Sequence, residues 1–151
     1  MRITVLSLLA AAVLAAPIAA FADATPTTSS AANQFCKQQQ TTLGANFATA
    51  YRTFGKCVSS NTKNATNAID NASKACSAER TANPTAFKNK NAFGKCVSAK
   101  VSQAAKVAAT KAPSALSQCK AARKSDSAAF AAKWGSNADA LGKCVATTAK
   151  G

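Results

Sequence analysis

The sequence has no histidine, only five acidic residues, and a single methionine, tryptophan and tyrosine among its 151 residues. The acidic residues, which lie singly along the chain, are Asp23, Asp70, Glu79, Asp126 and Asp139. Without histidine, the Ser-His-Asp and Cys-His mechanisms and histidine-rich metal sites are excluded. A carboxylate pair that hydrolyses glycosides would have to assemble from distant parts of the chain, and no sequence feature points to one. We therefore predict no catalytic residues, no cofactor and a protein that is not an enzyme.

Long apolar runs are missing after residue 22. Before that point, a positive charge at Arg2 precedes an almost unbroken apolar stretch over residues 3–16, and small residues at Ala20 and Ala22 form a cleavage site. This pattern is typical of a secretory signal peptide, which we predict over residues 1–22. A retained membrane anchor is the alternative, but the stretch is short for a bilayer. We expect a secreted protein with no transmembrane segment once the signal is removed.

Alternating strand patterns and bulky apolar side chains are also scarce. The hydrophobic content of 48% is largely alanine, and no stretch shows sustained period-two alternation. We therefore predict an all-α fold with a thin core, which burial alone would stabilise poorly. Residues 23–32 are small and polar without a periodic apolar face, and we predict a flexible leader there. Residues 33–150 are expected to form one helical domain.

Six cysteines are present, and none forms a Cys-x-x-Cys pair. Zinc sites bring their ligands in closely spaced pairs or add histidine, so we predict no metal site. In an exported chain with a thin core, disulfides are the expected role of cysteine. The six residues are Cys36, Cys57, Cys76, Cys96, Cys119 and Cys144.

The cysteines divide the chain into three repeated units. The first cysteine of each unit is followed eleven residues later by a phenylalanine: Phe47, Phe87 or Phe130. The second lies in a Gly-Lys-Cys-Val tetrapeptide that occurs three times. Phenylalanine and this cysteine are 10, 9 and 14 residues apart in the three units, so a surface loop should lie between them. We predict tandem helical hairpin repeats over about residues 33–64, 65–108 and 109–150, linked by long helices.

Local signals place several helix ends. Apolar residues recur at helical spacing before Cys76, and that helix should stop near Ala82. Asn83 followed by Pro84 is typical of the start of a short helix, and Asp126 should cap another. A long amphipathic helix after the second unit should break or restart at Pro113.

Helix geometry limits the cysteine pairing. If residues 57–76 form one helix, its two end cysteines lie roughly 28 Å apart, whereas a disulfide needs Cα atoms about 5.5 Å apart. Within a unit, the chain reverses through a loop, so its two cysteines can meet on antiparallel helices. The predicted pairs are Cys36 with Cys57, Cys76 with Cys96, and Cys119 with Cys144.

Two repeated side-chain types have alternative roles. Lys56, Lys95 and Lys143, which precede the second cysteine of each unit, are candidate anion contacts or merely solvated lysines beside a glycine that permits close packing. The aromatic residues are expected in the core rather than stacked on nucleic-acid bases, because they recur at a fixed distance from a buried cysteine. They are Phe47, Tyr51, Phe87, Phe130 and Trp134.

The formal charge is +14, or +13 without Arg2 of the signal peptide. We expect electrostatic binding to anionic cell-envelope polymers or other polyanions, or a charge that serves solubility alone. The basic residues form no dense block or arginine-rich helix, so we predict no sequence-specific nucleic-acid binding. The alternatives are a structural or adhesion module that binds another protein in a groove between repeats, and a membrane-active cationic protein.

The second unit is similar to a repeat found in small exported proteins of actinobacteria. The shared features are a cysteine helix at residues 75–80, a Pro-x-x-Phe turn at 84–87 and a closing Phe-Gly-Lys-Cys-Val-Ser at 93–98. The repeat has Asp where this chain has Asn83, and the second unit lacks the aromatic-glycine loop of the repeat. The likeness covers most of residues 33–148, although the first unit has Leu43-Gly44 in place of the proline turn. The resemblance implies export, a bacterial source and a repeat architecture, and it implies no particular activity.

Overall fold

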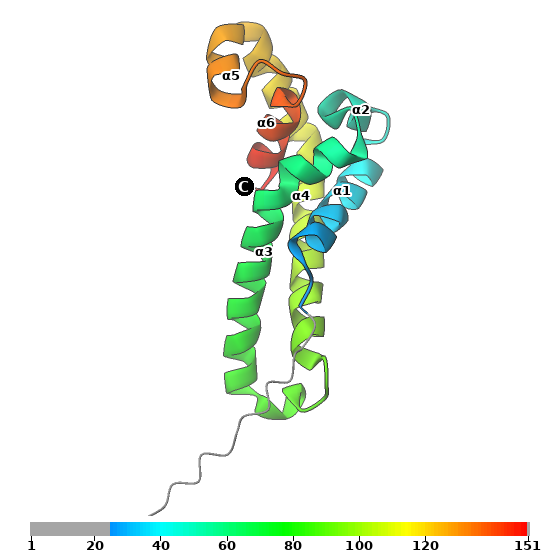
Figure 1. Ribbon diagram of the computed structural model, residues 1–151, viewed down its shortest axis with the longest axis vertical. Coiled ribbons are helices and arrows are strands. Elements are labelled where there is room, and N and C mark those ends of the chain that lie inside the picture. The colour runs from blue at the N-terminus through cyan, green and yellow to red at the C-terminus, as the bar shows by residue number, and fades with distance from the viewer. Residues whose placement is uncertain (1–24, 151) are drawn as a thin grey trace, which may run out of the picture.

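The computed structural model describes residues 25–150, and the predicted signal peptide lies outside them (Figure 1). Every regular element in this part is helical, which confirms the predicted all-α class. The elements are α1 (Thr28–Leu43), α2 (Asn46–Tyr51), α3 (Phe54–Ala82), the 3-10 helix η1 (Pro84–Phe87), α4 (Ala92–Ser125), α5 (Ser127–Trp134) and α6 (Ala140–Ala149).

Helices α3 and α4 run antiparallel along the length of the molecule, and η1 lies at the turn between them (Figure 1). Helices α1 and α6 each pack against both of them at the other end. The chain thus forms an up-down-up-down bundle of unequal helices. One half of the α3–α4 pair extends beyond the rest of the bundle.

The predicted flexible leader is wrong for its C-terminal part, because α1 begins at Thr28. The Thr27 side chain caps this helix by accepting a hydrogen bond from the Ser30 backbone N–H at 3.2 Å. Ala31 and Ala32 are fully buried and belong to the core between α1, α3 and α4. Alanine has high helix propensity and fits where two helices approach closely, so this short segment folds without a bulky apolar residue.

Three local predictions of helix ends are confirmed. Helix α3 ends at Ala82, and the Asn83 side chain then caps η1 by accepting from the Ala86 backbone N–H at 3.3 Å. Asp126 caps α5 in the same way, with Oδ1 2.8 Å from the Ala129 backbone N. These contacts satisfy backbone donors that have no partner inside the helix.

The predicted break at Pro113 is wrong, because α4 continues through it to Ser125. The proline ring lies on the exposed side of the helix, whereas Ala112, Ala115 and Leu116 are buried in the core. Packing on both sides of the proline therefore holds the helical path although one backbone hydrogen bond is lost. Packing in the core therefore outweighs the tendency of proline to break a helix.

All three predicted disulfides are present. Cys36–Cys57 joins α1 to α3, Cys76–Cys96 joins α3 to α4, and Cys119–Cys144 joins α4 to α6, with Cα–Cα distances of 5.8, 6.0 and 6.0 Å. Each bridge therefore ties one bundle helix to the next one along the chain. By restricting the unfolded chain, each closed loop contributes about 3 kcal/mol.

The core does not follow the predicted unit boundaries. One buried cluster combines residues of the first and third units, including Phe47, Tyr51 and Leu141. The second cluster combines the start of α1 with alanines and valines of the α3–α4 pair. Phe87 and Trp134, both expected in the core, are only half-buried. The first unit thus packs against both other units, and we find one shared bundle core.

A polar network lies inside the first cluster, beside the Cys36–Cys57 bridge. The Tyr51 hydroxyl donates to Gln39 Oε1, and Gln39 Nε2 donates to Asn61 Oδ1 at 3.4 Å. Asn61 Nδ2 in turn donates to the Cys57 carbonyl at 3.1 Å. Burial raises the pKa of Tyr51 well above its usual value, while a hydrogen bond with Asn61 lowers it by less. The phenol is therefore held in its neutral form.

This pKa shift predicts a loss of stability at alkaline pH. The folded state disfavours tyrosinate, so the free energy of unfolding should fall by about 1.4 kcal/mol per pH unit above about pH 10. Tyr51 is the only tyrosine, so the ultraviolet absorbance of tyrosinate reports on this group alone. Tyrosinate should appear together with unfolding. The Tyr51→Phe variant should lack this component of the pH dependence, and tyrosinate formation in the folded protein near pH 10 would contradict the burial.

Candidate anion-binding surface

The lysines of the three Gly-Lys-Cys-Val tetrapeptides are all exposed, but their surroundings differ. Lys56 Nζ lies 2.8 Å from Asp139 Oδ2, which joins the start of α3 to the loop before α6. Lys95 and Lys143 form no ion pair with any described residue. Lys56 is thus partly neutralised, and the three lysines are not equivalent.

These three lysines also do not form one site. Lys56 lies in the first turn of α3, and Lys95 lies in the first turn of α4, next to Cys96, whose Cα is 6.0 Å from that of Cys76 on α3. Since 20 residues of α3 separate Lys56 from Cys76, the two lysines lie roughly 30 Å apart along the bundle. Lys143 lies on α6, at the same end as Lys56 (Figure 1). Each lysine remains a separate candidate contact.

The glycine of the tetrapeptide has a packing role in the third unit. A Cβ atom at Gly142 would lie 2.8 Å from Tyr51 Cδ1 and 3.3 Å from the Ala50 carbonyl oxygen. Glycine therefore lets α6 approach α2 closely. At Gly55, the equivalent position of the first unit, a Cβ atom would meet nothing within 4 Å.

This difference predicts opposite effects of one substitution in the two repeats. Gly142→Ala should destabilise the protein by about 1–3 kcal/mol, because the added methyl group overpacks a buried contact. Gly55→Ala should be neutral or stabilise the protein by up to about 1 kcal/mol, because alanine favours the helix. Urea unfolding of both variants measures the two values. Equal effects would contradict the close approach at Gly142.

Many of the basic residues lie on the α3–α4 pair and on the turn between these helices. We call residues 63–111 the basic hairpin; they include η1 and contain nine basic and two acidic residues. The basic residues are Lys63, Lys74, Arg80, Lys88, Lys90, Lys95, Lys100, Lys106 and Lys111. The basic hairpin therefore contains about half of the chain's 19 basic residues.

Most of this charge has no acidic partner. Among residues 25–150 the ion pairs are Lys56–Asp139 and Lys100–Glu79, so only Lys100 of the basic hairpin is paired, at 2.7 Å. Arg80 lies over the Phe93 ring, with its guanidinium carbon 4.9 Å from the ring centre. The remaining cations are available to ligand anions.

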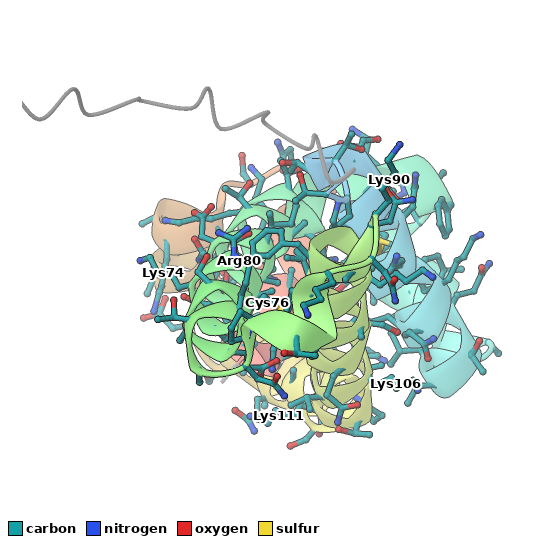
Figure 2. All side chains as sticks on the ribbon, turned by 90° about the horizontal axis from the view of Figure 1, so that it is seen from below. Lys74, Cys76, Arg80, Lys90, Lys106 and Lys111 are labelled. Atoms are coloured by element: carbon teal, nitrogen blue, oxygen red, sulfur yellow. A yellow bond between two sulfur atoms is a disulfide. The ribbon has the colours of Figure 1, made fainter. Side chains whose placement is uncertain are left out.

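The cations surround the basic hairpin. Figure 2, which views the molecule end-on, shows Lys74, Lys90, Lys106 and Lys111 on different sides. Within α4, lysines that share a side are eleven residues apart, as are Lys95 and Lys106, which places them about 16 Å apart along the helix axis. The surface is a charged rod with well-spaced cations on every side, and it has no single flat basic face.

The basic hairpin is closed by the most exposed of the three disulfides. Cys96 is half-buried, whereas the other five cysteines are at most 4% exposed. Glu79 Oε2 lies 3.5 Å from Cys96 Sγ, and the two sulfur atoms and the carboxylate come within 4.8 Å of one another. Both sulfur atoms are bonded to each other, so they are not thiolate ligands for a metal in this oxidised form.

This exposure predicts the order in which the disulfides are reduced. Mild thiol treatment should open Cys76–Cys96 first, because thiol exchange requires access to a sulfur atom. Alkylation followed by peptide mapping identifies the reduced pair. The singly reduced protein should lose about 3 kcal/mol of stability. Earlier labelling of Cys36 or Cys119 would contradict the exposure seen in the structure.

Sequence reasoning found the three repeated lysines but missed the basic hairpin as a unit. The available signal was the eleven-residue spacing of Lys63 with Lys74 and of Lys100 with Lys111. That spacing places lysines on one side of a helix, because eleven residues complete about three turns. It does not show that the two helices pair, and the pairing is what concentrates the charge.

Comparisons with protein-family models, with curated proteins and with solved structures gave no match for this chain. None of the helices in residues 25–150 combines the length and the apolar character that a membrane span requires.

Proposed function

We propose that this chain is an exported, non-enzymatic protein that binds flexible polyanions, such as anionic polymers of a cell envelope, through its basic hairpin. The observation that carries the proposal is the ring of unpaired cations on a disulfide-closed pair of helices. Three disulfides are typical of proteins that fold in an oxidising compartment, which supports export.

The arrangement of the cations favours a flexible ligand over a rigid duplex. A duplex touches one side of a rod, whereas a flexible chain can wrap around it and meet lysines on several sides. Each phosphate or carboxylate contact releases counterions, so affinity should fall steeply with salt. A lysine acts as a point charge in such contacts and requires no fixed ligand geometry.

The membrane-active alternative has less support. Val107, at 41%, is the one large hydrophobic residue classed as exposed among the described residues. The apolar helix faces are instead directed into the two core clusters. Insertion into a bilayer would therefore require the bundle to open against its disulfides.

We also infer that the three cysteine units derive from one hairpin pattern. The support is the common phenylalanine spacing, the shared tetrapeptide and the same bridge between successive bundle helices. In this view α3 and α4 each belong to two overlapping hairpins, and only the α3–α4 hairpin projects from the bundle.

The proposal predicts a salt-dependent affinity that depends on the position of the charges. The logarithm of the association constant for linear polyphosphate should fall linearly with the logarithm of the salt concentration. The triple variant Lys74→Gln, Lys90→Gln, Lys106→Gln should reduce that slope by about 2, since each lost contact removes about 0.7. Calorimetry or fluorescence anisotropy over a salt series measures both slopes.

The matched control is Lys37→Gln, Lys120→Gln, Lys124→Gln, which removes the same charge from exposed positions outside the basic hairpin. Its slope should change by less than about 1. Equal losses in the two variants would show that net charge alone attracts the polymer. Binding that is indifferent to salt would overturn the proposal in favour of a protein-binding module.

A further inference from the structure

The Cys76–Cys96 bridge differs from the other two bridges in having a carboxylate beside it. Glu79 follows Cys76 by three residues, so α3 places both side chains on the same side of the helix. The equivalent positions of the first and third units hold Gln39 and Ala122, which have no carboxylate. Among residues 25–150, the group at this bridge is the one set of three cysteine or acidic side chains close enough together to hold a metal ion.

The approach of this carboxylate to the bridge has no explanation in the oxidised form. Glu79 Oε2 lies 3.5 Å from Cys96 Sγ, but a disulfide sulfur atom carries no hydrogen that the oxygen could accept. The Lys100 ammonium lies 2.7 Å from the other oxygen, Oε1. This ion pair orients the carboxylate and leaves Oε2 beside the sulfur atoms.

The distances suit zinc once the sulfur–sulfur bond is open. Tetrahedral zinc binds sulfur at about 2.3 Å and carboxylate oxygen at about 2.0–2.2 Å, so two such ligand atoms lie roughly 3.5 Å apart. Glu79 Oε2 and Cys96 Sγ already have this separation. Two thiolates on one zinc ion lie roughly 3.8 Å apart. Rotation of the cysteine side chains can provide that separation, because the two Cα atoms are 6.0 Å apart.

We propose that Cys76, Cys96 and Glu79 form a zinc site that exists only while their bridge is reduced. A reductant supplies two electrons to the disulfide, which becomes two thiols, and zinc then displaces one proton from each thiol. Water occupies the fourth tetrahedral position, as in other zinc sites with three protein ligands. Zinc, two thiolates and one carboxylate together carry one negative charge, which the Lys100 ammonium balances.

The ligand set selects zinc and explains why a search for close cysteine pairs does not find the site. Magnesium and calcium require oxygen ligands, so thiolates disfavour them. Zinc accepts both sulfur and carboxylate oxygen. The two cysteines are 20 residues apart in the sequence, and they meet because α3 packs against α4. The site is distinct from the proposed polyanion surface, because its three ligands are not basic residues.

Zinc titration of the partly reduced protein tests the proposal. A phosphine reduces the exposed bridge by taking oxygen from water, and it adds no competing thiol. Alkylation and peptide mapping identify material in which the other two bridges are intact. We expect one zinc ion per chain in competition with a chromophoric chelator, and no binding by the oxidised protein. Equal binding by the oxidised protein, or no binding by the reduced protein, would overturn the proposal.

Glu79→Gln tests the third ligand. Removal of the carboxylate should weaken zinc binding by the reduced protein at least about tenfold. The matched control is Asp70→Asn, which removes the same charge from an exposed position of the same helix and should leave the affinity unchanged. Equal weakening in the two variants would show that net charge attracts the ion, and it would contradict the assignment of Glu79.

Cobalt(II) distinguishes a built thiolate site from loose binding to an opened chain. The reduced protein should show thiolate-to-cobalt charge transfer in the near ultraviolet and the strong visible bands of tetrahedral cobalt. Cys76→Ser with Cys96→Ser should show neither, while its circular dichroism matches that of the reduced, zinc-free protein. Weak octahedral bands in the reduced protein, or zinc affinity that survives unfolding in urea, would exclude the site.

Zinc should also protect the open bridge from oxidation. Thiolates bound to zinc are not free to attack glutathione disulfide, so saturating zinc should slow closure of the bridge and raise Tm of the reduced protein alone. An unchanged rate of closure would contradict ligation by the thiolates. The triple lysine variant used for polyanion binding should keep its zinc affinity, so failure of one proposal is distinguishable from failure of the other.

Discussion

The structure depends on the disulfides that join successive bundle helices, because a core made largely of alanine buries little apolar surface per residue. Residues such as Ala65, Ala105 and Ala112 are fully buried, yet each removes only one methyl group from water. Their benefit is close helix approach. The three bridges close loops of 20–25 residues and restrict the unfolded chain, which offsets the small buried area. The disulfides therefore supply the stability that the thin alanine core does not.

Local rules predicted the parts of this fold that local physics controls. The caps at Asn83 and Asp126 and the end of α3 depend on backbone donors within a few residues. The cysteine pairing was also accessible, since a straight helix keeps cysteines far apart and a reversal brings them together. Pro113 was misjudged because buried neighbours on both sides hold α4 together. The start of α1 was missed because Ala31 and Ala32 give no periodic apolar signal.

The candidate sites were less predictable because they depend on which helices pair. A repeated Gly-Lys-Cys-Val suggested three equal positions, but the bundle places Lys56 and Lys95 at opposite ends and pairs only Lys56 with Asp139. The same tetrapeptide contains a glycine with open space in one unit and a tight contact in another. Sequence repetition preserves local form, whereas packing of the first unit against the third gives each copy a different environment.

The projecting hairpin combines high charge with the least protected bridge, and the two features are physically linked. Nine cations against two acidic residues repel one another, which disfavours packing the two helices side by side. The Cys76–Cys96 bridge and the buried Val97 and Val101 hold the helices together against this repulsion. A polyanion that neutralises the lysines would remove the same repulsion, and by linkage it would bind the closed hairpin more tightly than an opened one. If the basic hairpin binds a polyanion as proposed, the ligand and the disulfide would stabilise the same state of the molecule.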